Sequence, residues 1–556
     1  MTNLETKTIN GEEIKHAVYG IGNKNDIVFI KKNLHTDKGL EPTVEFIENY
    51  KRPFWISKPN FRKYKQKKES ESLSKLKEFN CRQMDLPYSI SKALGRFSPQ
   101  NRLRIVCQSP YVYGADVTPP VLIKHANKKL FPNCVSANSL AVLDIETDTV
   151  KGTGEIISVA LSFKDKAIVT ATKDWIGDIV DIKEQFYAKL EENLGDTIKA
   201  RNTNVEVYIG TTPGDCIVEV IKRAHEWKPD VIGIWNINFD IPKIVEALDR
   251  EGFDLGDLLS DPIVPAEFRK AKYNKGSTQK VTATGKITSK HPAECWHTVQ
   301  SLSSFQFLDL MAVYCLIRIA KGKSPSYALD YILNKHLGKR KLKFDAVKSL
   351  ENTLQWHIQM QTHYKPEYMV YNLFDCVGCE LLDEAIKDIA FILPTLNGIS
   401  EYATFSSQPR RTCDNLHFFY LESENEVFGT TSDNMEEELS KYVYNLKDWV
   451  VTLDAHQIVD NGIPVFMEIP ELRSYIRIEL YDLDCVSTYP TTEIVANISK
   501  ATTFMELCKI KGLDEITQRS IGINLTGGPT NALEIAHCAF GFPLVDELLE
   551  DFLQAA

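Results

Sequence analysis

The sequence predicts a mixed α/β protein built from several domains, and three observations carry this prediction. Its 556 residues exceed a single compact domain of roughly 150 residues. Its 43% hydrophobic and 25% charged residues are ordinary globular values, which argue against wholesale disorder and a coiled-coil rod. From Ser139 onward, short β-rich runs alternate with helical patterns, which is typical of an α/β domain.

The texture of the sequence divides the chain into three regions. Residues 1–138 predict an α+β N-terminal domain with strand-like runs and one basic helix at Lys65–Phe79. Residues 139–397 predict the α/β domain, and residues 398–556 a linking region followed by a β-rich segment at 474–491. Within the α/β domain, hydrophobic periodicity predicts strands at 139–146, 155–163, 166–173 and 231–240; helices at 181–194, 213–227, 241–252, 305–322, 327–338 and 366–393; and a hairpin or mobile insertion at 272–297.

Three features of the sequence bear on the cellular compartment: apolar runs, the N-terminal residues and the cysteines. No uncharged apolar run approaches the ~18 residues that a transmembrane helix needs, and the polar start MTNLETKTINGEEIKH does not resemble a signal peptide. Twelve cysteines without framework spacing predict reduced thiols. We therefore expect a cytoplasmic protein, in the host cytoplasm if the chain is viral, without a membrane partner.

The charge distribution is uneven. The net charge is −10, yet residues 51–110 contain 15 Lys and Arg against 4 Asp and Glu. Such asymmetry is typical of one surface that meets a polyanion such as nucleic acid. A basic outer face of a packed N-terminal domain explains the same counts, and the sequence leaves both interpretations open.

Paired carboxyl groups end the first strand of the α/β domain. Asp144 and Glu146 stand two residues apart, so their side chains share one face of the strand. Burying two carboxylates side by side costs several kcal/mol unless a cation lies between them, and a divalent metal is the usual cation. Solvent exposure of the pair is the alternative.

Two further elements bring carboxyl groups. Asp240 ends the apolar run GIWNINFD at a strand-to-helix junction, where sites in open α/β sheets form. An N-cap of the following helix explains Asp240 equally well. Tyr371 and Asp375, four residues apart, share one face of a predicted helix. The edge of an amphipathic helix is the alternative for that pair.

The order of these elements is more specific than each alone. D-x-E, N-x-x-F-D after 96 residues and Y-x-x-x-D after another 135 resemble the proofreading exonuclease of family B DNA polymerases. SPSYALDYI, LGKRKLKFD and YNLFD look like the bacteriophage members, and Asn236-Ile-Asn-Phe-Asp240 has the short spacing of protein-primed phage polymerases. The resemblance runs from about Ser139 to Asp383 and implies an RNase H-like exonuclease domain.

The resemblance also implies a chemistry. Two Mg²⁺ or Mn²⁺ ions would be held by Asp144, Glu146, Asp240 and Asp375, with Asp144 bridging them. Tyr371 would orient the attacking water, and Asn236 and Phe239 would contact the terminal nucleotides. The implied substrate is single-stranded DNA, degraded 3′ to 5′ during proofreading in viral DNA replication.

A truncated polymerase part follows. YDLDCVSTYPTTEI resembles motif A of the same family, with Asp484 as a metal ligand and Ser487 and Tyr489 matching the pattern; a plain buried strand is the alternative. No D-T-D or K-x-x-x-N-x-x-Y-G segment follows Asp484, so the palm is partial. We expect a second polypeptide to supply the remaining palm, fingers and thumb, and primer-template DNA to be a partner of the split enzyme.

Other interpretations stay open beside this one. A non-catalytic, polymerase-derived DNA-binding or scaffold protein would bind DNA without metal-dependent turnover. A free-standing repair exonuclease would act without a polymerase partner. The H-x-x-x-C-x-H group at His291, Cys295 and His297 lacks a fourth zinc ligand, and Cys376 and Cys379 lie within a predicted helix without a second pair. We interpret the former as loop residues and the latter as core.

Overall fold

The computed structural model is mixed α/β and multi-domain, and it divides into two compact units, residues 1–436 and 437–556. This division does not address the predicted boundaries after residues 138 and 397, which stay predictions. Among the described residues, no helix is both long and apolar enough to cross a bilayer. The structure describes residues 8–95, 102–281, 285–319, 322, 324–350, 353–393, 407–422 and 425–431, all within the first unit.

The N-terminal part contains two small antiparallel sheets. One has the order β1 (Ile9–Ile21), β2 (Asp26–Thr36), β3 (Gly39–Glu48), and α3 (Pro119–Leu130) packs on it. The other has the order β6 (Leu76–Cys81), β4 (Arg52–Ser57), β7 (Val112–Tyr113), and is covered by α1 (Leu86–Ala93) and α2 (Leu103–Val106).

The predicted basic helix at Lys65–Phe79 is wrong. That stretch contains strand β5 (Ser70–Ser72), a 3-10 turn and the start of β6. The periodicity of its charges resembled a helix, but Phe79 stacks on Phe54 of β4 across the sheet. Cross-strand packing therefore outweighs the local pattern.

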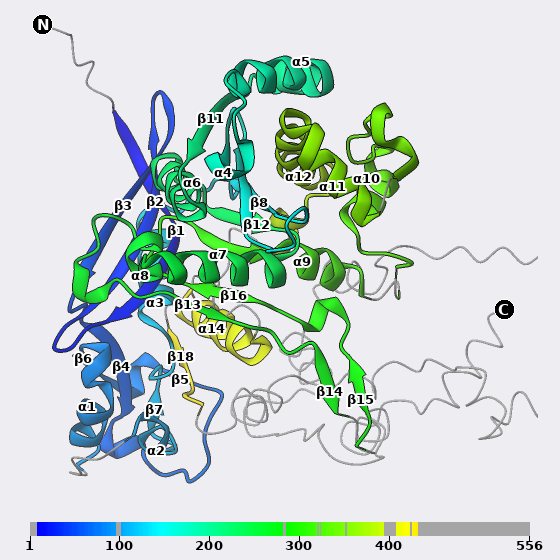
Figure 1. Ribbon diagram of the computed structural model, residues 1–556. Helices are drawn as coiled ribbons and strands as arrows, with labels where there is room; N and C mark the ends of the chain where they lie inside the picture. Colours follow the sequence, from blue (N-terminus) through cyan, green and yellow to red (C-terminus); the bar gives the residue numbers. More distant parts are fainter. Residues whose placement is uncertain are drawn as a thin grey trace, which may run out of the picture. The chain divides into compact units, whose positions relative to one another are not determined.

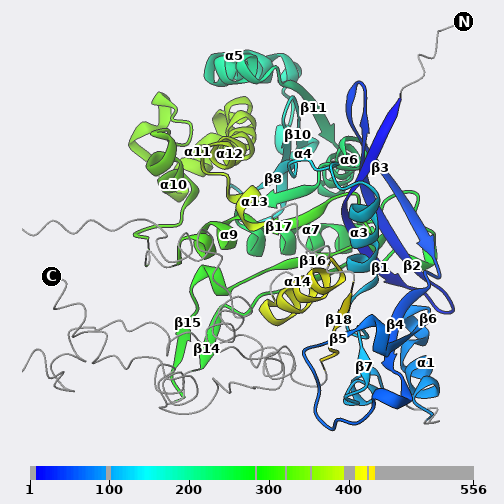
Figure 2. The ribbon, with the colours of Figure 1, turned by 180° about the vertical axis from the view of Figure 1, so that it is seen from behind.

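A mixed six-stranded sheet forms the centre of the α/β part (Figure 1). Strand β9 runs antiparallel to both of its neighbours, whereas the other neighbouring pairs are parallel. The edge strands β11 and β17 can both be followed in Figure 2. In sheet order the strands are β11 (Asn204–Gly210), β10 (Lys166–Thr172), β9 (Ile156–Phe163), β8 (Leu140–Thr147), β12 (Val231–Ile234) and β17 (Gln306–Asp309).

Helices cover both faces of this sheet, and strand β8 divides its side chains between them. Ala141, Leu143 and Ile145 belong to a core shared with α6 (Pro213–Trp227), α7 (Ile237–Glu251) and α8 (Leu255–Leu259). Leu140 and Val142 belong to the opposite core. The helices of that second core are α4 (Lys173–Ile176), α5 (Ile182–Arg201), α9 (Leu310–Ile317), α10 (Leu329–Leu337), α11 (Leu354–His363), α12 (Lys365–Ile386) and α13 (Asp388–Ile392).

Most predicted elements of the α/β part are present, with four differences. The predicted strand at 231–240 ends at Ile234, and α7 already begins at Ile237. The predicted helix at 305–322 begins as strand β17, because its first residues pair with β12 at the sheet edge. The predicted helix at 366–393 breaks at Lys387, which has a left-handed φ of 59°. The 272–297 segment contributes to two short ribbons, not one hairpin. Strand β13 (Lys272–Asn274) pairs with β16 (Thr298–Gln300), and β14 (Gln279–Val281) pairs with β15 (Ile287–Ser289).

The described residues after 406 return to the N-terminal part. Strand β18 (Glu426–Phe428) pairs antiparallel with β5, some 350 residues earlier in the chain. Helix α14 (Gln408–Glu422) packs against β18 and α3. The described residues of the predicted linking region, 407–422 and 425–431, are therefore part of the N-terminal fold.

A buried ion pair joins the N-terminal sheet to the α/β part. The Lys31 ammonium on β2 bonds to the Asp230 carboxylate, just before β12, and donates to the Lys228 carbonyl at 2.9 Å. Both side chains are at most 2% exposed. Asp230 also accepts from the Ser139 backbone N–H and hydroxyl at 2.7 and 2.8 Å. Burial raises the pKa of Asp230, but Lys31 and these other partners outweigh it and lower the pKa.

We expect Asp230→Ala to lower the free energy of unfolding by about 3–5 kcal/mol, because it leaves the Lys31 ammonium buried without its counter-ion. Urea denaturation measures this change. Asp174→Ala is the control: it breaks the exposed pair with Lys151 and should change stability by less than about 1 kcal/mol. Equal effects of the two substitutions would contradict a special role for the buried pair.

Candidate metal centre

Strand β8 presents two carboxyl groups toward helix α12. Asp144 and Glu146 continue the alternate positions of Leu140 and Val142, which face the core that contains α12. The Asp144 Oδ2 accepts a hydrogen bond from the Asn372 side-chain amide at 2.8 Å. The Glu146 Oε2 accepts one from the Tyr368 hydroxyl at 2.5 Å. Both carboxyl groups are partly buried, so the solvent-exposed alternative is wrong.

Helix α12 carries the other half of the site on one stripe. Tyr368, Tyr371, Asn372 and Asp375 follow the spacing that aligns side chains along a helix. Asp375 is 5% exposed and Tyr371 7% exposed. Oxygen atoms of Asp144, Glu146 and Asp375 all lie within 4.8 Å of one another, and we name these three residues the acidic trio. Tyr371 and Asp375 therefore lie inside the protein and not on the edge of an amphipathic helix.

Asp240 approaches the trio from the other side but does not belong to it. It lies in the first turn of α7, after strand β12 has ended at Ile234, and it is 2% exposed. The helix N-cap is Asn236, so the capping interpretation of Asp240 is wrong. The Asp240 Oδ2 is buried without a hydrogen-bond partner, although Asp240 interacts electrostatically with Glu146 and Asp375.

The carboxyl groups line a cavity of about 510 Å³. Asn236 and Phe239, the two residues expected to contact nucleotides, line it as well, and Phe239 is 41% exposed. The lining of the cavity therefore combines acidic and aromatic side chains. Its remaining lining residues are Ile145, Trp235, Met311, Tyr327, Ala328, Leu329, Lys341 and His357.

Lys341 places a positive charge inside this acidic cavity. Its ammonium bonds to the Asp375 Oδ2 and donates to the Tyr371 hydroxyl at 3.0 Å. Burial lowers the pKa of Lys341, but Asp375, Tyr371 and Asp144 outweigh it and raise the pKa. The lysine is therefore charged and partly compensates the acidic trio.

Crowding of acidic groups changes their ionisation. Burial, followed by repulsion from neighbouring carboxyl groups, raises the pKa of Asp144 and of Asp240 well above its usual range. Burial raises the pKa of Glu146 to about 7, although the bond from Tyr368 acts in the opposite direction. Burial and Asp375 also raise the pKa of Tyr371, which therefore stays a protonated hydroxyl at neutral pH.

The donor set fits a hard divalent cation. Carboxylate oxygens are the preferred protein ligands of Mg²⁺ and Mn²⁺. The Asp375 Oδ1 and the Asp240 Oδ2 are buried without a hydrogen-bond partner, so each offers a free acceptor. The acidic trio can hold one ion directly, and Asp240 across the cavity is the fourth predicted ligand.

Sequence reasoning missed three contributors to this site. Lys341 lies in LGKRKLKFD, a segment that indicates only the family resemblance, and a single lysine among its four cations gives no signal of its own. Tyr368 and Asn372 lie on the same helical stripe as Tyr371, so the i, i+3 and i+4 rule identifies them once that helix is recognised.

Other predicted residues lie apart from the cavity or outside the described chain. The motif A residues Asp484, Ser487 and Tyr489 lie outside the described residues. His297 bonds to the Tyr273 hydroxyl at 2.7 Å, and His291 to the Tyr327 hydroxyl at 2.9 Å. These partners agree with their interpretation as ordinary polar residues. Cys376 and Cys379 are buried in the core, as predicted.

The crowded carboxyl groups predict an unusual pH dependence for the metal-free protein. Because the pKa of Glu146 is higher in the folded chain, its contribution to stability is present below pH 4.5 and is lost as the pH rises through about 7. We expect a loss on the order of 2 kcal/mol from this group between pH 5 and pH 8. Urea denaturation in a chelating buffer measures it.

Glu146→Gln should flatten this dependence, since the amide does not titrate, and Mg²⁺ at pH 8 should restore stability to the unmodified chain. Asp165→Asn, in the exposed turn between β9 and β10, is the control and should keep the original slope. An unchanged slope in Glu146→Gln would contradict the raised pKa.

Comparison with known proteins gives no further guide to this site. No protein-family model matches the chain, and no curated protein matches it either. The resemblance to family B polymerases therefore rests on the motif residues themselves. The function that this resemblance implies must therefore be judged from the chemistry that the cavity side chains allow.

Proposed function

We propose that the chain is a metal-dependent 3′–5′ exodeoxyribonuclease with a proofreading role. The observation that carries this proposal is the acidic trio at a cavity that also contains Asp240. A buried carboxyl cluster with free oxygen atoms is costly without a cation, and divalent ions held this way serve phosphodiester chemistry. The 3′-to-5′ direction and the single-stranded DNA substrate come from the motif resemblance.

The acidic trio and Asp240 would hold two divalent ions. Bound there, Mg²⁺ or Mn²⁺ would lower the pKa of water and neutralise charge that develops on the scissile phosphate. Asp240 and Asp375 each contribute the buried oxygen that lacks a hydrogen bond in the protein. Asn372 and Tyr368 hold Asp144 and Glu146 in position through one hydrogen bond each.

Tyr371 and Lys341 act beside the carboxyl groups. The Tyr371 hydroxyl, protonated at neutral pH, accepts from Lys341 and can donate its own proton to orient an attacking water. Lys341 holds the Asp375 and Tyr371 side chains in place through one hydrogen bond to each. Its ammonium would also supply positive charge where the DNA phosphate enters. Phe239, which lines the cavity and is exposed, offers a face on which the terminal base can stack, and Asn236 offers a side-chain amide.

We further propose that this exonuclease is an RNase H-like domain in the N-terminal part of a split family B DNA polymerase. The mixed sheet with one reversed strand and helices on both faces supports the domain assignment. The split rests on the motif A resemblance at Asp484. Co-purification from the native cell tests it: the expected partner contains the missing D-T-D and N-x-x-Y-G segments.

Loss of a trio carboxylate should abolish degradation. We expect Asp144→Ala and Asp375→Asn each to slow Mg²⁺-dependent shortening of a 3′ single strand about 10³-fold or more, because several kcal/mol of charge stabilisation is lost. Time courses with a 5′-labelled oligonucleotide measure the rate. Asp165→Ala, on the exposed β9–β10 turn, is the matched control and should retain the full rate. Undiminished degradation in both trio variants would disprove the assigned site.

Tyr368 should control metal affinity more than the reaction itself. Tyr368→Phe keeps the ring but removes the hydroxyl that fixes Glu146, so we expect the Mg²⁺ concentration for half-maximal rate to rise about 10- to 100-fold. The rate at saturating Mg²⁺ should fall much less. Tyr364→Phe, at the start of the same helix, is the control. An unchanged Mg²⁺ requirement would show that the Tyr368 bond does not position Glu146 for metal binding.

A further inference from the structure

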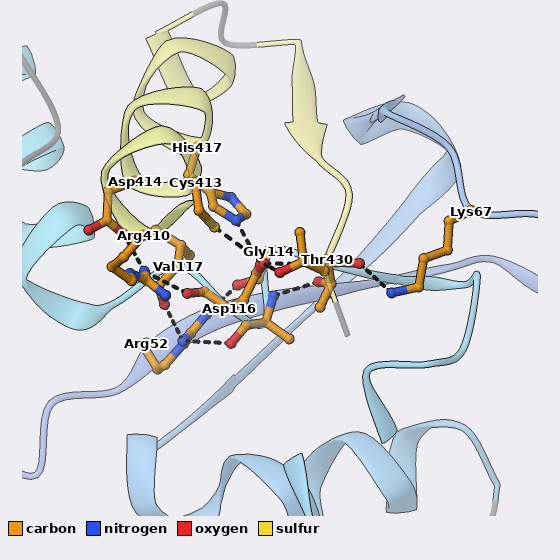
Figure 3. A network of polar contacts seen from close by, with 12 residues as sticks. Arg52, Lys67, Gly114, Asp116, Val117, Arg410, Cys413, Asp414, His417 and Thr430 are labelled. Atoms are coloured by element: carbon orange, nitrogen blue, oxygen red, sulfur yellow. Dashed lines mark hydrogen bonds and ion pairs between the residues drawn. The ribbon is translucent and has the colours of Figure 1, made fainter. Parts of the chain in front are cut away.

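A second cluster of metal-binding side chains lies in the N-terminal part, away from the acidic trio (Figure 3). It joins Asp116, in the loop between β7 and α3, to Cys413 and His417 on α14. Cys413 and His417 stand four residues apart and so share one helical face. Cys413 is fully buried and His417 is 1% exposed. The cluster therefore brings carboxylate, thiol and imidazole groups together inside the protein.

The donor atoms converge on one small volume. The His417 Nε2 lies 2.7 Å from the Asp116 Oδ1, and the Cys413 Sγ lies 3.4 Å from the Asp116 Oδ2. One donor atom from each residue lies within 4.8 Å of the other two. Zinc–ligand bonds of about 2.0–2.3 Å place ligands around one ion roughly 3–4.5 Å apart. The histidine–aspartate pair, now at 2.7 Å, would have to separate by roughly half an ångström.

The loop that carries Asp116 is held in place from several directions. The buried Arg52 guanidinium donates to the carbonyls of Gly114, Ala115 and Val117 around it. Arg410 donates to the Asp116 carbonyl at 2.8 Å. The backbone on which the carboxylate stands is thus preorganised, as a metal ligand requires.

Hydrogen bonds to the Asp116 carboxylate complete a supporting shell. Its Oδ2 accepts from the Thr431 backbone N–H at 2.9 Å and from the Thr431 hydroxyl at 2.5 Å. Burial raises the pKa of Asp116, but His417 and Thr431 outweigh it and lower the pKa, so the group is a carboxylate. Carboxylates that bind metals are themselves hydrogen-bonded in this manner. The three residues leave a fourth position, which water would fill.

We infer that Asp116, Cys413 and His417 form a structural site for a borderline-soft divalent cation, with Zn²⁺ the best match. Thiolate and imidazole ligands suit Zn²⁺ and disfavour Mg²⁺, whose sites are built from oxygen alone. When the zinc–sulfur bond forms, the Cys413 S–H bond breaks and its proton passes to solvent. The His417 Nε2 offers its lone pair, and the ring proton moves to Nδ1. The ion would then cross-link α14 to the 114–118 loop, some 300 residues apart in sequence.

Metal content of the full chain tests this site. The chain is expressed with added Zn²⁺ and purified in buffer with excess Mg²⁺, which competes at the carboxylate cavity but not at a thiolate–imidazole site. We expect about one equivalent of zinc, with Co²⁺ replacement giving a sulfur-to-cobalt charge-transfer band that reports thiolate ligation. The absence of both bound zinc and the cobalt band would overturn the inference.

Substitutions at Cys413 and His417 distinguish a metal site from a cluster that is held together by hydrogen bonds alone. Cys413→Ser retains a donor for Asp116 but loses the thiolate, so zinc affinity should fall more than the ~100-fold typical of losing a supporting residue. His417→Gln should have the same effect. Cys295→Ser, a partly buried cysteine beside His291, should keep its zinc. Unchanged zinc affinity in Cys413→Ser would also overturn the site, whereas the cobalt band of the unmodified chain decides the question if a variant fails to fold.

Discussion

Repulsion among buried carboxyl groups is the constraint on which the candidate site depends. Asp144, Glu146 and Asp375 bring oxygen atoms within 4.8 Å of one another, with Asp240 close enough to raise their mutual repulsion. A fold gains no stability from this arrangement, because each group is both desolvated and near a like charge. This cost is the reason for our proposal that cations complete the cluster, and the raised pKa values belong to the chain without them.

Lys341 partly offsets this repulsion from within the chain. Its ammonium hydrogen-bonds Asp375 and Tyr371, and its charge also acts to lower the pKa of Asp144, Glu146 and Asp240. One positive charge is thus shared among four carboxyl groups. The two carboxyl oxygens without hydrogen bonds, Asp240 Oδ2 and Asp375 Oδ1, indicate where acceptor capacity is still free. An excess of negative charge therefore stays in the cavity, since one lysine cannot neutralise four carboxylates.

Much of this site follows from sequence periodicity, and the rest does not. Alternation along β8 predicts that Asp144 and Glu146 share a face, and the helical repeat predicts that Tyr371 and Asp375 do. Asp240 was expected at a strand end but lies in the first turn of α7, because β12 stops at Ile234. Strand ends depend on pairing with neighbours, which local patterns do not encode. The position of Lys341 likewise depends on how α10 and α12 pack, and this tertiary packing cannot be derived from the local sequence pattern.

The acidic trio and the cluster of Asp116, Cys413 and His417 differ in the interactions that hold their helices, strands and loops together. The acidic trio draws on β8 and α12, which share one hydrophobic core, so packing alone brings its residues together. Asp116 and α14 share only a small apolar contact region, through Val117 and Phe418, and are joined mainly by polar bonds around Arg52, Asp116 and Arg410. A cross-linking ion would add most where the apolar core is smallest, because little burial otherwise offsets the entropy of ordering that segment. The cluster of Asp116, Cys413 and His417 lies at such a junction. The acidic trio instead lines a cavity of about 510 Å³, which a substrate can approach.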